Sequence, residues 1–402
     1  MESAHLELAG VVMEQGRIHA YAGDRAQATS CYQRALEAAG ALEREGPVSG
    51  KARQQLAALL MAMSDLQRPA GDFQGALDAS QRAVKILEGL ASEEPDSLEV
   101  RHNLAIALSS ISRSKAFAND LEAARQARQR SIQLLEELRQ RQPQDTTLQR
   151  DLMVGYGSLG DILGSPTLPS LGDRPGAERA YRRAASLAES MATADPSNRR
   201  AQADHAIALT RLASVIAPEK SQEALSIYRQ ALELFRAVAA ADPNNVNVAM
   251  NTAHLFLMMG ERKIEAGDWP GASESLREAH QLCRQILDRK PGESSTERVF
   301  IWVLAAEVRL LVRIGRRGEA VARARQALAF AEREGQGRTA FQSGMLRARA
   351  YATMALASSG PAACHWYRTS LQWWEKLRQD KAYHVGYERE RRQAAQAASK
   401  CQ

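Results

Sequence analysis

The sequence predicts an all-α protein, a solenoid of about eight antiparallel helix hairpins that ends in a capping helix. The chain has 402 residues, more than the roughly 250–300 at which a single hydrophobic core stops growing. Aromatic residues make up 5% of it and charged residues 25%, in a composition that favours helices. A helical pattern also recurs about every 48 residues. Such a period is typical of a solenoid in which each hairpin contacts only its neighbours.

The repeat is clearest in the second helix of each hairpin, which begins near a small alanine. The eight alanines are Ala28, Ala76, Ala124, Ala177, Ala224, Ala272, Ala320 and Ala363, at intervals of 48, 48, 53, 47, 48, 48 and 43 residues. Four residues after them stand Tyr32, Ser80, Arg128, Tyr181, Tyr228, Leu276, Ala324 and Tyr367, and seven residues after them always Ala or Ser. Offsets of four and seven share one helix face, so we expect this face to pack closely on a neighbouring helix.

Turn signals separate the expected helices. Gly or Asn followed by Asp precedes most of the alanines, as in Asn119-Asp120 and Gly267-Asp268. Gly or Asn suits the left-handed residue that ends a helix, and Asp can cap the next one. A proline such as Pro243 marks the end of most hairpins, because proline cannot continue a helix. The hairpins are expected at residues 3–46, 49–94, 97–142, 145–194, 197–241, 244–290, 293–335 and 338–379, and the capping helix at 381–402.

These repeats resemble the tetratricopeptide repeat (TPR). The fourth repeat carries the family's motif as Tyr156, Leu159, Gly160, Leu163, Ala177, Tyr181, Ala184 and Pro196, and the sixth carries it as Phe256, Met259, Gly260, Gly267, Ala272, Leu276, Ala279 and Pro291. The resemblance implies a right-handed superhelix whose first helices line a concave groove. The family period is about 34 residues, so each helix here is longer by roughly two turns. Such elongated arrays are similar to those attached to bacterial serine/threonine kinase-type signalling proteins, although this chain has no kinase motif.

Three stretches depart from the period. An insertion at 165–172 separates the helices of the fourth repeat, and shorter turns lie at 217–220 and 358–361. The insertion has two interpretations, a tolerated surface loop or a recognition loop.

Several classes of function have no sequence signal. No secretion signal and no apolar run of about 18 residues occurs, which predicts a cytoplasmic protein without membrane contact. The four cysteines, Cys31, Cys283, Cys364 and Cys401, form no CxxC pair, which argues against a zinc site or a dense disulfide framework and favours a reducing compartment. The GxGxxG match at 155–160 falls inside an expected helix, and no catalytic motif is present. We therefore predict no catalytic residue, cofactor or metal, and no enzyme. The net charge of +6 comes from charges of mixed sign, so nucleic acid is not the expected partner.

Charged residues mark a candidate groove. The TPR resemblance places one groove-facing residue five positions beyond the motif's aromatic site in each first helix. These residues are Arg17, Asp65, Arg113, Asp161, Ser214, Glu261 and Arg309. Neighbouring helices pack about 8–10 Å apart, so the alternating signs of the first four can meet. Two interpretations stay open: exposed ion pairs worth about 0–1 kcal/mol each, or a ladder that a charged ligand enters.

His254 and Trp302 complete the candidate groove. Trp302 lies in the first helix of the seventh repeat and is either a packing residue or an aromatic anchor of the kind that dominates interfaces. The expected function is a non-catalytic scaffold that holds a peptide or a partner protein. One alternative is a regulatory or sensor module of a bacterial kinase-type signalling system, with a serine/threonine kinase-type protein as its partner. A more remote one is an RNA-binding solenoid.

Overall fold

The computed structural model describes residues 2–22, 25–45, 49–67, 72–165, 169–333, 340–380, 383 and 387–401. Within these residues the chain forms 17 helices and no strand. It divides into an N-terminal unit, Met1–Ala177, and a C-terminal unit, Glu178–Gln402. The all-α prediction is confirmed, while the continuation of both units as a single solenoid stays a prediction.

The N-terminal unit contains α1 (Glu2–Ala22), α2 (Arg25–Glu45), α3 (Gly50–Gln67), α4 (Phe73–Glu93), α5 (Leu98–Phe117), α6 (Leu121–Arg141) and α7 (Thr146–Gly164). The C-terminal unit contains most of α8 (Arg174–Ala194), then α9 (Arg199–Ile216), α10 (Ser221–Ala241), α11 (Val246–Ala266), α12 (Trp269–Arg289), α13 (Ser294–Arg313), α14 (Arg317–Glu332), α15 (Ala340–Ala357), α16 (Gly360–Leu377) and α17 (Glu388–Ser399).

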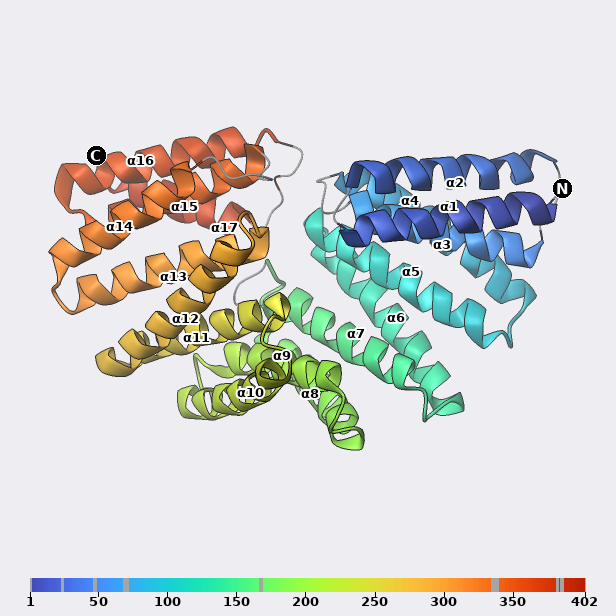
Figure 1. Ribbon diagram of the computed structural model, residues 1–402, viewed down its shortest axis with the longest axis horizontal. Coiled ribbons are helices and arrows are strands. Elements are labelled where there is room, and N and C mark those ends of the chain that lie inside the picture. The colour runs from blue at the N-terminus through green and yellow to red at the C-terminus, as the bar shows by residue number, and fades with distance from the viewer. Residues whose placement is uncertain are drawn as a thin grey trace. The chain divides into compact units, whose positions relative to one another are not determined.

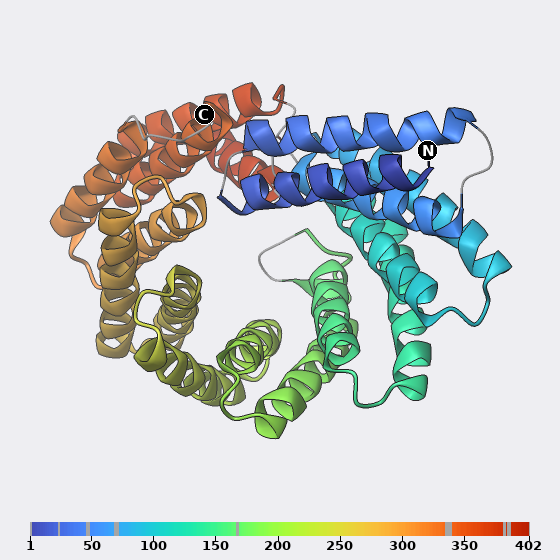
Figure 2. The ribbon, with the colours of Figure 1, turned by 45° about the vertical axis from the view of Figure 1, so that its right-hand side comes forward.

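Within each unit, successive helices pack side by side as hairpins, and the hairpins stack in chain order (Figures 1 and 2). First helices also contact each other: α1 with α3 and α3 with α5 in one unit, and α9 with α11, α11 with α13 and α13 with α15 in the other. The first helices therefore form one continuous layer in each unit, as a solenoid requires.

The turn chemistry follows the sequence signals. Asn119 and Gly267 adopt left-handed conformations with φ of 64° and 77°. The next residue then caps the following helix: Asp120 accepts a hydrogen bond from the Ala123 amide and Asp268 accepts one from the Gly271 amide. The corresponding signal at 23–24, and Gly71 of the next one, lie outside the described residues.

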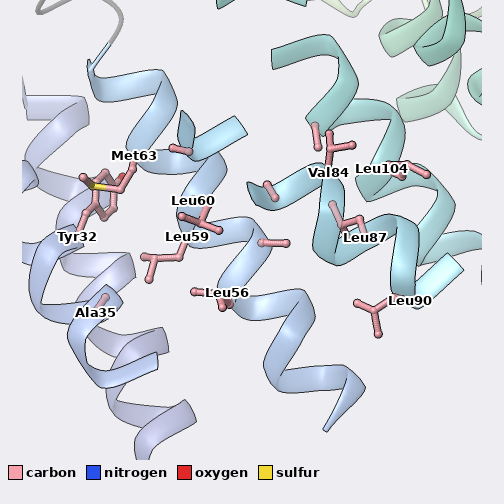
Figure 3. Packing of buried hydrophobic residues seen from close by; sticks show 14 of the residues in the cluster. Tyr32, Ala35, Leu56, Leu59, Leu60, Met63, Val84, Leu87, Leu90 and Leu104 are labelled. Carbon is pink, nitrogen blue, oxygen red and sulfur yellow. The ribbon is translucent and has the colours of Figure 1, made fainter. Parts of the chain in front are cut away.

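The repeated helix face is the core of the protein. Seven of the eight aligned alanines have 0% exposure, and only Ala363 is half-buried. The residue four positions later is also buried in the first seven repeats, with at most 3% exposure. In Figure 3 the ring of Tyr32 on α2 lies beside Met63 of α3. Buried positions that recur at the repeat period hold neighbouring hairpins together.

The two helices of a hairpin pack closely where a small residue on the first helix faces a large residue on the second. A Cβ atom on Gly16 would lie 2.5 Å from the Tyr32 ring, and one on Gly260 would lie 2.8 Å from Leu276 Cδ2. Such distances are shorter than real Cβ contacts, so an alanine at Gly16 or Gly260 would force the facing side chain to move.

In other repeats a larger residue occupies this first-helix position, and a smaller second-helix residue faces it. Ser64 faces Ser80 with the two hydroxyl oxygens 2.7 Å apart, and Ser110 from the next first helix joins them at 3.3 and 3.1 Å. Val308 faces the much smaller Ala324. Each repeat thus keeps its packing density while the residue types change.

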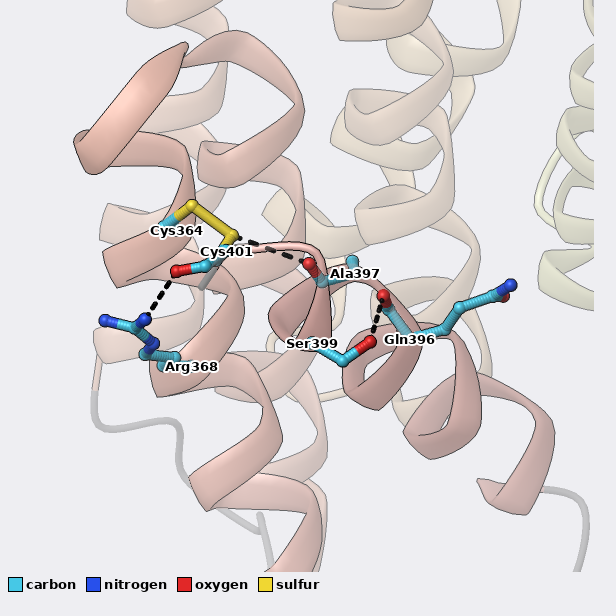
Figure 4. The surroundings of a disulfide bond; sticks show 6 residues. All are labelled: Cys364, Arg368, Gln396, Ala397, Ser399 and Cys401. Carbon is cyan, nitrogen blue, oxygen red and sulfur yellow. Dashed lines mark hydrogen bonds between the residues drawn. A yellow bond between two sulfur atoms is a disulfide. The ribbon is translucent and has the colours of Figure 1, made fainter.

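The cysteines correct one expectation. Cys364 of α16 and Cys401, just beyond α17, form a disulfide (Figure 4), and Arg368 donates a hydrogen bond to the Cys401 carbonyl at 2.8 Å. The expectation of a reducing compartment is at odds with this bridge, because disulfides persist mainly in oxidising surroundings. The two cysteines are 37 positions apart and meet only because α17 packs back against α16. Cys31 and Cys283 are buried thiols.

Candidate functional site

The structure pairs the alternating charges of the first helices in two places. Arg113 Nη2 on α5 lies 3.0 Å from Asp65 Oδ1 on α3. In the C-terminal unit, Arg309 on α13 forms an ion pair with Glu261 on α11. The four side chains are between 27 and 54% exposed. Solvent therefore screens both pairs, and each contributes about 0–1 kcal/mol.

The remaining members of the series make other contacts. Arg17 pairs with a glutamate one turn earlier on α1. Asp161 acts electrostatically on Arg128 of α6, and the Ser214 hydroxyl lies 2.9 Å from the Tyr228 hydroxyl. Asp65–Arg113 and Glu261–Arg309 are thus two ion pairs within the predicted series.

A row of three large side chains crosses the first helices of the C-terminal unit. His254 on α11 lies beside Trp302 on α13, with ring centroids 6.5 Å apart. The Arg349 guanidinium on α15 lies 4.9 Å from the centre of the Trp302 ring on its other side. These three residues, here called the first row, occupy equivalent repeat positions, since each lies 48 or 47 residues after the one before it.

A second row lies seven residues further along the same helices. It consists of Glu261, Arg309 and Leu356. Seven residues are two helical turns, so both rows share one face. The second row borders a hollow of about 520 Å³, whose other lining residues are Ile264, Glu265, Val312 and Arg313. Leu356 is 37% exposed there, an apolar side chain open to a partner.

The N-terminal unit lacks such a row. Its equivalent positions hold Gly10, Ala58, Ile106 and Val154, of which none is aromatic or charged. Interface anchors are typically Trp, Tyr and Arg. The best candidate site is therefore the face of α11, α13 and α15.

Arg349 is the most constrained member of the first row. It is 7% exposed, and its Nε and Nη2 donate hydrogen bonds of 2.7 Å each to the two carboxylate oxygens of Glu390 on α17. The Tyr387 ring lies 5.9 Å from the guanidinium. Burial acts to lower the pKa of Arg349, but the Glu390 carboxylate outweighs it and raises the pKa. Arg349 is therefore a fixed positive charge in this face.

Arginines near the first row influence the pKa values of the groups around it. Burial, followed by the charges of Arg298 and Arg211, lowers the pKa of His254 to about 4, so His254 is neutral at pH 7. Arg298, one turn before Trp302, is solvent-exposed, yet the surrounding protein and then Arg349 lower its pKa. Burial is the larger cause of both pKa shifts, and the neighbouring arginines add to it.

Sequence reasoning found His254 and Trp302 but missed Arg298, Arg349 and Glu390. The repeat register could have identified Arg349, because it follows Trp302 by 47 residues, as Trp302 follows His254 by 48. No sequence signal identifies Glu390, since it belongs to the capping helix, which has no counterpart in the repeats.

A second hollow of about 410 Å³ lies between α12, α13 and α14. Its Glu307 carboxylate lies 3.2 Å from His280 Nδ1 and 3.2 Å from Arg323 Nε. The carboxylate is already neutralised by groups of the same chain. This cluster therefore stabilises the contact of three helices and has no vacant binding group.

The described residues contain neither a metal site nor a membrane-spanning helix. No three His, Cys, Asp or Glu side chains in that part of the chain gather closely enough to hold a metal ion. None of the described helices is long and apolar enough to cross a membrane.

Known structures share the fold. No family model matches the chain, and no curated protein matches its sequence. The apo form of RapI is similar over 92% of this chain and 99% of its own, with 11% identity and a TM-score of 0.50. A signal-transduction ATPase with a tetratricopeptide repeat sensor, PH0952 from Pyrococcus horikoshii, is similar over 100% of this chain and 48% of its own, with 12% identity and a TM-score of 0.52. The chain therefore has a TPR-like helical-repeat fold, and identities this low carry no function.

Proposed function

We propose that this protein is a non-catalytic interaction module that binds a peptide segment of another protein across α11, α13 and α15. The observation that carries the proposal is the double row on one face: His254, Trp302 and Arg349, then Glu261, Arg309 and Leu356 two turns away. It combines an aromatic anchor, charged groups and a hollow lined by both apolar and charged side chains, which are usual elements of a peptide site.

The rows also suit an extended or helical segment in size. Seven helical residues span about 10 Å, and three first helices side by side span about 16–20 Å. A segment of roughly six residues in extended form, at about 3.3 Å per residue, covers that width. The kinase-type partner expected from the resemblance stays a prediction, and a kinase reading frame adjacent in the genome would support it.

Affinity capture from the native host tests the proposal. The full chain serves as bait beside the variant Leu356→Glu, which places a charge in the hollow. Bound proteins are identified and then titrated with purified bait by calorimetry. We expect Leu356→Glu to weaken binding of the captured partner at least tenfold.

Val154→Glu is the matched control. Val154 occupies the first-row position of the fourth repeat and is 39% exposed, against 37% for Leu356. It should bind like wild type, and thermal melts should show both variants folded. If Val154→Glu abolished binding and Leu356→Glu did not, the site would lie on the N-terminal unit and the proposal would be wrong.

A further inference from the structure

Two arginines lie at this end of the face, Arg349 in the first row and Arg298 one turn before Trp302. Arg349 is neutralised by Glu390. Arg298, one turn before Trp302 on α13, is exposed and makes no hydrogen bond or ion pair with any residue that the structure describes. Its strongest charged neighbour is Arg349, which repels it, ahead of Glu293 and Glu390. Arg298 is therefore a positive charge that no described carboxylate contacts within ion-pair distance.

The capping helix shows which group the face accepts. Glu390 places both carboxylate oxygens 2.7 Å from Arg349 nitrogens, behind the Trp302 ring. Bidentate pairing of this kind is the preferred geometry between Arg and a carboxylate. Arg349 Nη1 is itself buried without a hydrogen-bond acceptor among the described residues, so the corner has fewer acceptors than donors.

We propose that the bound segment is acidic: a carboxylate of the partner pairs with Arg298 beside Trp302, and an apolar side chain enters the hollow at Leu356, at a level eleven helical residues or roughly 16 Å further along the helix axis. This inference rests on the proposed function and adds the chemistry of the partner. In an extended segment at about 3.3 Å per residue, roughly 16 Å corresponds to an Asp or Glu followed about five residues later by Leu, Ile, Val or Met.

The second row argues against a polyanion such as RNA. The hollow is lined by the carboxylates of Glu261 and Glu265 as well as by Arg309 and Arg313. Arg309 is already paired with Glu261, so the positive charges of the hollow form no continuous track. A chain of phosphates laid across the face would meet these carboxylates, whereas a segment with one acidic end and an apolar residue would not. The face is therefore suited to a local negative charge.

A random twelve-residue peptide display library, selected on the purified full chain, tests this inference. We expect enriched peptides to contain Asp or Glu about five positions from an apolar residue. The best enriched peptide is then synthesised with a fluorescent label and titrated by anisotropy. Arg298→Gln should weaken its binding about tenfold, and 0.5 M NaCl should weaken wild-type binding similarly.

Arg229→Gln is the matched control, because Arg229 is an exposed arginine on α10 without a partner among the described residues. It should change affinity less than twofold. A selection without enrichment of acidic peptides overturns the inference, and so does equal binding of the peptide to wild type and Arg298→Gln. If only Leu356→Glu then lost peptide binding, the proposed function would still stand. A labelled twelve-nucleotide oligouridine that binds more tightly than the peptide, and loses affinity in Arg298→Gln, would also overturn it and assign the face to nucleic acid.

Discussion

Among the residues that the structure describes, each unit buries one arginine, and the two arginines have opposite kinds of partner. Arg128 of α6 is 2% exposed and Arg349 of α15 is 7% exposed. Arg349 donates two hydrogen bonds to Glu390. Arg128 bonds only neutral groups, the hydroxyl and carbonyl oxygens of Ser109. Burial lowers the pKa of Arg128 to about 9, with Arg113 adding to the effect and Asp161 opposing it, whereas the pKa of Arg349 is raised.

The comparison teaches that the partner, rather than the depth of burial, determines how a buried charge affects stability. A charge taken out of water without a counter-ion is strongly unfavourable. Arg128 occupies the second-helix position where other repeats have the uncharged residues Tyr, Leu, Ser or Ala. Its buried charge therefore lowers the stability of the N-terminal unit. Arg349 instead fastens α17 to the repeats.

The largest effect is expected from removing the partner of Arg349. Glu390→Gln keeps the shape of the side chain and deletes its charge. Loss of one member of a fully buried pair costs about 3–5 kcal/mol. Because the Glu390 side chain is 29% exposed, we expect about 2 kcal/mol less stability in guanidinium unfolding. Glu233→Gln, whose side chain is 71% exposed and pairs only with Arg236, should change stability by less than about 0.5 kcal/mol. Equal effects of both variants would contradict this account.

The opposite sign is expected for Arg128. Arg128→Met removes the unpaired charge and fills the site with a flexible apolar side chain. We expect stabilisation by about 1–2 kcal/mol, as when apolar residues replace buried charges elsewhere. The control Arg130→Met lies on the same helix at an exposed ion pair with Glu88 and should be close to neutral. Destabilisation by Arg128→Met, measured by urea unfolding, would show that the Ser109 hydrogen bonds outweigh the desolvation of the charge.

The advantage of Arg128→Met should shrink at high pH. The folded-state pKa of Arg128 is lowered to about 9 from 12.5, so between these values the unfolded chain binds more protons than the folded one. Stability contributed by this group therefore rises with pH across that range, and the wild type gains while the variant does not. Unfolding of both proteins at pH 7 and pH 10 measures the change. A constant difference between them would mean that Arg128 stays charged throughout.

The parts of the structure that repeat could be predicted from the sequence, and the parts that occur once could not. The aligned alanines identified the buried face because every hairpin reuses it, and the same register places His254, Trp302 and Arg349 in one row. Glu390 and the disulfide of Cys364 with Cys401 involve the capping helix and its flanking residue. This helix occurs once, so no repeated pattern indicates where it packs. The unfavourable site of Arg128 was visible in sequence as the one charged residue in a column that is otherwise aromatic, aliphatic or small. The hydrogen bonds from Arg128 to Ser109 could not be predicted from the sequence, because they depend on side-chain conformation.

The smallest effect is expected at the exposed pair of Asp65 and Arg113, which tests the comparison from the solvent side. In a double-mutant cycle with Asp65→Asn and Arg113→Gln, we expect a coupling free energy of about 0.5 kcal/mol or less. The same cycle at Glu261 and Arg309, where the Glu261 side chain is only 27% exposed, should give a somewhat larger value, and 1 M NaCl should reduce both. If the partner and its screening by solvent govern these charges, couplings should increase from Asp65–Arg113 through Glu261–Arg309 to Arg349–Glu390. An N-terminal coupling as large as that of the buried pair would break the ordering, because it would require an exposed pair to interact as strongly in water as a desolvated one.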